Sequence, residues 1–358
     1  MMAAETPNQG PGAVLRERAA ELAQAAVAHQ YERTPCLAER YGRHGRAKCV
    51  ADVHYHLTFL AEAVALDRPE LFLDYIAWAK TVMVHYGVDV EHFRQSLESI
   101  DHVLGTTLPP NMCDAARRII CEARDALPDL PDAPPEPRRE DNPLADLCER
   151  YLTALLDGDR SAASHMISLA INNGTSVAGV YRHVFQQSQE ELGRLWQSNK
   201  ISVAQEHYCT AATQFIMTQL YPNVFSTKRC GRSVIAVCVS HGLHELGIRM
   251  VSDWFELNGW DSFYVGANTP KASIVKLLQD RRPHLLAVSA TMTFHLPQVI
   301  ELIAEVRREP DCATIPILVG GRVFNTFPEL AQLTGADGTA TDGEQAVQRA
   351  RQLVGESG

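Results

Sequence analysis

The chain has 358 residues, of which 46% are hydrophobic and 21% charged, and its formal net charge is −10. This length suits two or three domains, and the composition is that of a folded globular protein rather than a disordered or fibrous one. The acidic balance excludes a global basic surface for nucleic acid or anionic membranes. No apolar run is long enough to span a membrane, and the start, MMAAETPNQG, does not resemble a signal peptide. We expect a cytoplasmic protein without membrane contacts, whose nine cysteines are reduced because none forms a C-x-x-C pair.

Residues 1–126 are predicted to form an all-α domain. Residues 50–66 and 72–86 each place apolar side chains on one stripe at helical spacing, and no strand pattern interrupts this region. The next segment, residues 127–143, contains six prolines and five acidic residues. Because proline lacks the amide donor and blocks helix continuation, this segment predicts an extended linker.

Residues 144–226 are predicted to form a four-helix bundle. Turns rich in glycine, asparagine and serine separate the helices, and Ser202 with Gln205 forms a capping box. Short connections between helices of similar length favour an antiparallel bundle. The predicted helices are 144–157, 160–173, 176–196 and 202–221.

Residues 230–358 alternate between strand and helix patterns. The strand runs are apolar and β-branched without alternation, as expected for strands that are buried on both faces. This order predicts a flavodoxin-like, doubly wound parallel sheet covered by helices. The predicted strands are 233–240, 262–267, 285–291 and 315–321.

The residues that follow these strands point to a binding site, because ligands of parallel sheets bind at the carboxyl ends of the strands. The first loop carries His244 and lacks the G-x-G-x-x-G pattern of a dinucleotide site. A histidine here favours a metal ligand, and a glycine pair offers a flat backbone surface for a large planar group. The sequence therefore favours a metal macrocycle over a nucleotide.

His244-x-x-Gly247, Ser289-x-Thr291 and Gly320-Gly321 together resemble the cobalamin-binding domain. The resemblance implies that His244 replaces the cofactor's own base as lower cobalt ligand, and that the displaced nucleotide tail enters a slot lined by the serine and the glycines. The family usually has an acid two residues before the histidine, where this chain has Gly242. Loss of that acid weakens the histidine as a ligand, Ser240 or a backbone carbonyl could replace it, and His241 is an alternative ligand.

Trp196, Glu206 and His207 form a W-x9-E-H pattern that resembles the helical cap of cobalamin photoreceptors related to light-responsive repressors of carotenoid synthesis genes. The resemblance implies that Trp196 covers the upper adenosyl group, with Glu206 nearby, and that His207 becomes the upper cobalt ligand after light breaks the cobalt–carbon bond. Those repressors carry a DNA-binding domain, but residues 1–126 lack a basic recognition helix, so we expect no DNA binding.

Residues 56–78 resemble the globin-like domain of photocobilins, photoreceptors in which this domain and a cobalamin module together hold a linear tetrapyrrole. This resemblance predicts biliverdin as a second cofactor. Arg46 and Lys48 would pair with its propionates, His56 would face its pyrrole nitrogens, and Tyr86 would line the wall. The alternative is a solvated basic helix start and an ordinary core histidine.

The sequence as a whole predicts a light sensor, not an enzyme, that binds adenosylcobalamin and biliverdin. Light would move the cap and change self-association into homo-oligomers, or the binding of a partner protein. One alternative is a corrinoid methyl-carrier protein of a methyltransferase system. Another is a haem-binding globin-like sensor coupled to a cobalamin module, with His85 or His92 as proximal ligand.

Overall fold

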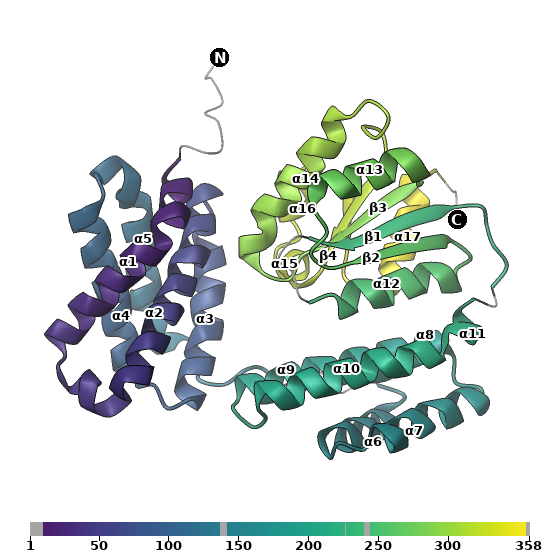
Figure 1. Ribbon diagram of the computed structural model, residues 1–358, viewed down its shortest axis with the longest axis horizontal. Helices are drawn as coiled ribbons and strands as arrows, with labels where there is room; N and C mark the ends of the chain where they lie inside the picture. Colours follow the sequence, from purple (N-terminus) through teal and green to yellow (C-terminus); the bar gives the residue numbers. More distant parts are fainter. Residues whose placement is uncertain (1–9, 137–141, 226, 240–243, 356–358) are drawn as a thin grey trace. The chain divides into compact units, whose positions relative to one another are not determined.

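The computed structural model describes residues 10–136, 142–225, 227–239 and 244–355. The chain divides into two compact units (Figure 1). The first unit contains Met1–Glu136 together with Arg194–Lys200, and the second contains Pro137–Gly193 and Ile201–Gly358. The boundary after Glu136 lies inside the predicted linker, whereas the transfer of residues 194–200 to the first unit was not predicted.

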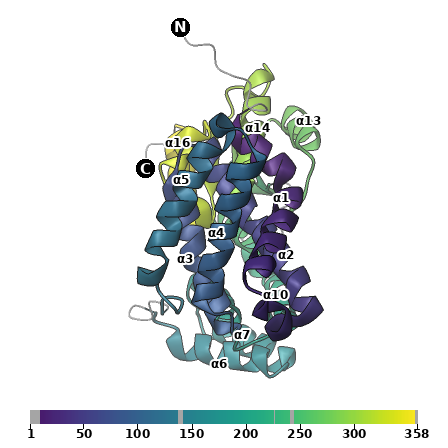
Figure 2. The ribbon, with the colours of Figure 1, turned by 90° about the vertical axis from the view of Figure 1, so that its left-hand side faces the viewer.

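The first unit is helical, as predicted (Figures 1 and 2). Proline occupies the first helical position of α1, α3 and α5, where its missing amide hydrogen costs no helical hydrogen bond. Helix α2 begins well before the predicted residue 50 and contains a kink at Gly42, whose φ is 61°. The helices are α1 (Pro11–Arg33), α2 (Cys36–Ala65), α3 (Pro69–His85), α4 (Val90–Thr107) and α5 (Pro110–Ala126), followed by the short turn η1 (Leu127–Asp129).

The core of the first unit combines apolar packing with two buried charges. Leu15, Leu57 and Phe72 are fully buried, and each such side chain stabilises the fold by roughly 1.5–3 kcal/mol. Glu62 is buried and accepts hydrogen bonds from Arg16 at 2.7 and 2.9 Å. Lys80 is also buried, and its Nζ lies 2.9 Å from the Asp132 carboxylate, so this ion pair joins the linker to α3.

The helical part of the second unit follows the predicted order. The third predicted helix is a continuous run whose middle is a π-helical turn, η2. The Ser202–Gln205 capping box is present at the start of α10. The elements are α6 (Ala145–Leu156), α7 (Arg160–Asn172), α8 (Val177–Val180), η2 (Tyr181–Gln186), α9 (Gln187–Gln197), α10 (Val203–Gln219) and α11 (Tyr221–Val224).

The remainder of the second unit is a parallel five-stranded sheet of order β2-β1-β3-β4-β5. This is the flavodoxin-like order, with its switch point between β1 and β3. The sequence missed β5, which has three residues, and placed the ends of the other strands within two residues of their observed positions. The strands are β1 (Ser233–Cys238), β2 (Asp261–Gly266), β3 (Leu285–Ser289), β4 (Ile317–Gly320) and β5 (Gly338–Ala340).

Helices cover both faces of this sheet (Figure 1). Helix α12 packs against α17, and α13 packs against α14. These helices are α12 (Leu246–Leu257), α13 (Lys271–Arg281), α14 (Leu296–Arg308) and α17 (Gly343–Leu353), and the shorter η3 (Thr293–His295), α15 (Arg322–Thr326) and α16 (Leu330–Leu333) complete the fold.

Two sequence predictions concern features of the whole chain. No disulfide joins any of the nine cysteines, all of which lie in the described part of the chain. Within the described residues, no helix has both the length and the apolar character needed to cross a membrane.

Candidate functional site

A cavity of about 200 Å³ lies at the carboxyl edge of the sheet, between β3–β5 and the helices α12 and α17. It is lined by four residues that the sequence singled out: Gly247 at the start of α12, Ser289 at the end of β3, and the pair Gly320 and Gly321 after β4. Thr291, the remaining member of the predicted set, does not line it. The strand register explains the grouping, because Ser289 pairs with Gly320.

Gly320 and Gly321 lie so close to neighbouring backbone segments that a larger residue does not fit. Gly321 has φ 94°, and a Cβ there would lie 2.4 Å from the carbonyl oxygen of Ala290 and 2.9 Å from the Ser289 hydroxyl. A Cβ on Gly320 would lie 3.1 Å from the carbonyl oxygen of Ala340. Any side chain at Gly321 would therefore displace the backbone that forms the cavity wall.

The bundle closes one side of this cavity through η2. Tyr181 and Gln186 of η2 line it, and the Tyr181 hydroxyl donates a hydrogen bond to the Asp253 carboxylate on α12 at 2.9 Å. Burial raises the pKa of Asp253 to about 6, although the Tyr181 hydrogen bond and nearby Arg249 act against this. The sequence analysis did not predict this pair. Its only local signal is that Asp253 is an acid among the apolar positions of an amphipathic helix.

His244 lies two residues before the start of α12 and is accessible to solvent. Surrounding protein nevertheless lowers the pKa of its imidazole below the ordinary value, while Glu206 opposes this shift and His207 adds to it. A neutral imidazole is the form that ligates a metal. The structure thus brings together His244, Glu206 and His207, which the sequence assigned to one site. Ser240, His241 and Gly242 lie outside the described residues.

Glu206 and His207 occupy the first turns of α10. Nδ1 of His207 bonds to the Glu206 carboxylate, whose other oxygen accepts a hydrogen bond from Thr210 at 3.0 Å. The His207 side chain is 74% exposed, so its ring is open to a ligand. Because Glu206 is held from both sides, it orients the imidazole beside it.

Trp196 is held by the first unit, a placement that the sequence did not predict. Its ring centroid lies 6.1 Å from that of Trp78 on α3. Two neighbours add to this contact, since Gln197 donates to the Thr81 hydroxyl and Asn199 donates to the His85 carbonyl at 3.2 Å. The indole Nε1 of Trp196 is buried and has no hydrogen-bond partner among the described residues.

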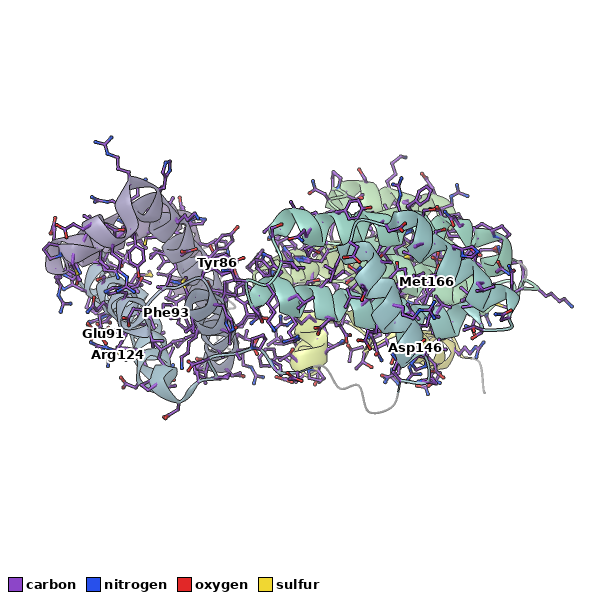
Figure 3. All side chains as sticks on the ribbon, turned by 90° about the horizontal axis from the view of Figure 1, so that it is seen from below. Tyr86, Glu91, Phe93, Arg124, Asp146 and Met166 are labelled. Carbon is purple, nitrogen blue, oxygen red and sulfur yellow. The ribbon has the colours of Figure 1, made fainter. Side chains whose placement is uncertain are left out.

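The residues predicted to hold a bilin do not share one environment. His56 is 2% exposed, and its Nδ1 lies 2.7 Å from the Tyr75 hydroxyl in the core. Arg46 and Lys48 are exposed, with the Arg46 guanidinium over the Tyr31 ring. Tyr86, at the end of α3, is 47% exposed (Figure 3).

The two histidines considered for a haem each make a hydrogen bond through Nδ1. His85 Nδ1 lies 2.8 Å from the Thr81 carbonyl, and His92 Nδ1 lies 3.0 Å from the Tyr41 hydroxyl. Both contacts use Nδ1, and a histidine that binds a metal through Nε2 commonly makes such a hydrogen bond, so the haem alternative stays open.

Comparison with family models concerns the second unit. A model described as the B12 binding domain matches residues 232–351, and a second model of the same description matches residues 147–221. These matches cover the sheet with its helices and the helical part that precedes it.

Three curated relatives resemble parts of the chain. It is 26% identical over 122 residues to the HTH-type transcriptional repressor CarA of Myxococcus xanthus, an alignment that covers 34% of this chain and 41% of the repressor. It is 19% identical over 216 residues to a corrinoid protein of Desulfitobacterium hafniense, covering 59% of this chain and 99% of that protein. It is 25% identical over 214 residues to dimethylamine corrinoid protein 2 of Methanosarcina mazei, covering 58% and 98%.

Among solved structures, the monomethylamine corrinoid protein of Methanosarcina barkeri superposes with a TM-score of 0.53 at 18% identity. The superposition covers 59% of this chain and 99% of that one. The shared fold is a helical part followed by a parallel sheet with its helices.

Proposed function

Through residues 147–221 and 232–351 this chain belongs to the cobalamin-binding proteins, and from this premise we propose that His244 is the lower cobalt ligand of a bound cobalamin. The nucleotide tail would then enter the cavity lined by Ser289, Gly320 and Gly321. Three properties support the fit: an accessible imidazole with a lowered pKa, a cavity at the sheet edge that Gly247 lines three residues further along the chain, and a backbone wall without side chains.

Bound cobalamin would supply a cobalt–carbon bond that light or a methyl acceptor can break. The chain's own residues would act around that bond. His244 would hold the lower face, Glu206 would orient His207, and Tyr181 would close the tail cavity from the bundle side. None of these steps needs a nucleophile or a general acid, so the protein is proposed to be a binding protein rather than an enzyme.

We propose that the bound form is adenosylcobalamin and that the protein is a light sensor. The observation that carries this proposal is the contact of Trp196 with Trp78. The residue that the resemblance assigns to the adenosyl group is held by α3, through its own ring and through Gln197 and Asn199. Loss of the adenosyl group would therefore act directly on the helices of the first unit.

A corrinoid methyl-carrier protein is the second candidate, and the comparisons by themselves favour it. Two corrinoid proteins align with this chain over 98% and 99% of their own lengths. In this reading, the first unit would serve as a docking domain for a methyltransferase. The resemblance assigns Trp196 to the upper ligand, where its ring would hinder methyl transfer, and this is why we place the sensor first.

Absorption spectra of the full chain distinguish the two functions. The protein is loaded in darkness with adenosylcobalamin or with methylcobalamin and then exposed to green light. A sensor should bind the adenosyl form more tightly and convert after illumination to one stable new spectrum. Tighter binding of methylcobalamin, with no lasting difference between the dark and light protein, would assign the carrier function instead.

Biliverdin as a second cofactor is proposed on the resemblance of residues 56–78 alone. The full chain should gain a red absorption band with biliverdin and none with haem. Because His56 is buried against Tyr75, binding would require that pair to open, so His56→Gln should change the band while His165→Gln on α7 should not. Uptake of haem in place of biliverdin would favour the haem-sensor alternative.

A further inference from the structure

A continuous row of oxidisable aromatic rings crosses the first unit. Trp196 lies 6.1 Å from Trp78, and Trp78 lies 6.1 Å from Tyr75, measured between ring centroids. Both spacings fall in the range of directly packed aromatic pairs. The row therefore connects the last turn of α9 to the interior of the helical unit without a gap.

The row ends on a tyrosine that has a proton acceptor. The Tyr75 hydroxyl lies 2.7 Å from Nδ1 of His56, and both residues are buried. Burial lowers the pKa of His56 to about 3 and raises the pKa of Tyr75 well above its ordinary value. The pair is therefore a neutral phenol hydrogen-bonded to a neutral imidazole.

The surroundings of this pair protect it. Phe59 stacks on the Tyr75 ring with centroids 3.7 Å apart, and Phe93 packs on His56 at 5.3 Å. Phenylalanine is far harder to oxidise than tyrosine, so the row cannot continue in these directions. Burial is the main reason why the pKa of Tyr75 is raised, and the nearby Asp52 carboxylate and Tyr55 hydroxyl add to it.

We propose that Trp196, Trp78 and Tyr75 form an electron relay that stores an oxidising equivalent on Tyr75. A one-electron oxidant removes an electron from Trp196 and is itself reduced by one electron. Trp78 then gives an electron to oxidised Trp196, and Tyr75 gives an electron to oxidised Trp78. As Tyr75 loses its electron, its hydroxyl proton passes to Nδ1 of His56, which leaves a neutral tyrosyl radical beside an imidazolium.

The indole nitrogen of Trp196 supports this direction of transfer. Because the buried Nε1 has no hydrogen-bond acceptor among the described residues, oxidised Trp196 has nowhere to deposit its proton. An oxidised indole that keeps its proton remains a strong oxidant, and it can take an electron from Trp78. At Tyr75, Nδ1 of His56 accepts the proton, so the oxidising equivalent remains on Tyr75.

The natural oxidant rests on the proposed function, which would supply a light-excited cobalt(III) corrin whose upper ligand the resemblance assigns to Trp196. The relay itself belongs to the polypeptide and can be tested without cobalamin. Failure of the relay and failure of cobalamin binding are therefore separate results.

The test oxidises the full-length apoprotein with light, using tris(bipyridine)ruthenium(II) and persulfate. Samples are frozen after the flash and examined by electron paramagnetic resonance, with ring-deuterated tyrosine identifying tyrosyl signals. Ascorbate added after the flash removes radicals on exposed tyrosines, so the remaining signal comes from buried ones. We expect a persistent tyrosyl radical in the parent protein.

Three variants locate that radical. Tyr75→Phe and Trp78→Phe should each lower the persistent signal several-fold. Tyr41→Phe is the matched control, because Tyr41 also contacts a histidine, His92, but is not part of the row. Circular dichroism and melting temperature confirm that each variant is folded.

The role of His56 has its own readout. Transfer of the proton inside the core makes the yield of the radical independent of bulk pH below the ordinary tyrosine pKa of about 10. His56→Gln keeps an acceptor for the hydroxyl but cannot take up the proton, so its radical yield should fall and become dependent on pH.

Several results would overturn the relay. These are the absence of a persistent tyrosyl signal in the parent, an unchanged signal in Tyr75→Phe, or an unchanged signal in Trp78→Phe. The last of these would mean that Tyr75 is oxidised directly and that the row of rings plays no part.

Discussion

The imidazole of His244 is the side chain that we propose as lower cobalt ligand. His244→Ala should leave cobalamin unbound or with its own base as lower ligand, because no other described imidazole occupies that position. Absorption spectra during cobalamin titration measure this change. His165→Ala on α7 is the control and should bind as the parent does. His241→Ala should have a smaller effect, and equal losses in the His241 and His244 variants would contradict the assignment.

Gly321 tests whether the cavity wall depends on close backbone approach. Gly321→Ala should lower stability by more than the roughly 1–2 kcal/mol of a left-handed alanine, because its Cβ would lie 2.4 Å from the Ala290 carbonyl oxygen. Gly174 has the same φ of 94°, and a Cβ added there would have no atom within 4 Å. Gly174→Ala therefore measures the cost of the left-handed backbone alone. Urea denaturation and cobalamin affinity are measured for both. Equal effects on both quantities would show that contact at Gly321 is unimportant.

At the scale of elements, the Tyr181–Asp253 hydrogen bond joins η2 to α12. The folded-state pKa of Asp253 is about 6, whereas an unfolded aspartate has a pKa of about 3.9. The folded state therefore binds the proton of Asp253 more tightly than the unfolded state does. The stabilisation that this proton gives to the folded state is present at low pH and is lost as pH rises through 6. Above that pH the buried carboxylate costs about 3 kcal/mol relative to acid conditions.

Asp253→Asn should remove this pH dependence, because an amide oxygen still accepts the Tyr181 hydrogen bond without carrying charge. The variant should melt several degrees above the parent near pH 8 and not near pH 4, as measured by circular dichroism. Asp280→Asn on α13 is the exposed control. If the melting temperatures of the parent and the Asp253 variant changed with pH in the same way, the buried charge would not be the cause of the pH dependence.

The end of α9 and the turn that follows it form the second element whose environment can be tested. Trp78→Ala removes the ring against which Trp196 packs, so the amides of residues 194–200 should exchange hydrogen faster with solvent. Exchange measured by mass spectrometry reports this directly. Leu73→Ala, at a partly exposed position on the same helix, should leave that peptide unchanged. Unaltered exchange in both variants would mean that the ring contact does not hold the turn.

At the scale of the whole molecule, the proposed light response requires His207 to replace the lost adenosyl group. His207→Ala should bind adenosylcobalamin in darkness and bleach in light, and should then fail to form a stable species with two histidine ligands. Light scattering after size exclusion should show that the parent changes its association state on illumination and the variant does not. Identical light-state spectra for the two proteins would remove His207 from the mechanism.

Local signals in the sequence were enough for most of the secondary structure. The Ser202–Gln205 capping box works within one helical turn, and it lies where it was predicted. The strand β1 was also predicted from its own residues, because a continuous apolar run is typical of a strand that is buried on both faces. In contrast, β5 is a three-residue strand that begins with glycine, and only its pairing with β4 makes it a strand.

The candidate site divides in the same way. The sequence alone determined the residue types and their order, from His244 to the glycine pair, because strand ends and loop residues follow from local patterns and parallel strands share one edge. Only the tertiary structure decided that Thr291 stays outside the cavity, that Tyr181 closes it, and that Trp196 rests on Trp78. It also decided that His56, at the border of an apolar stripe, turns inward to Tyr75. These outcomes depend on packing between segments far apart in the chain, which no local periodicity encodes.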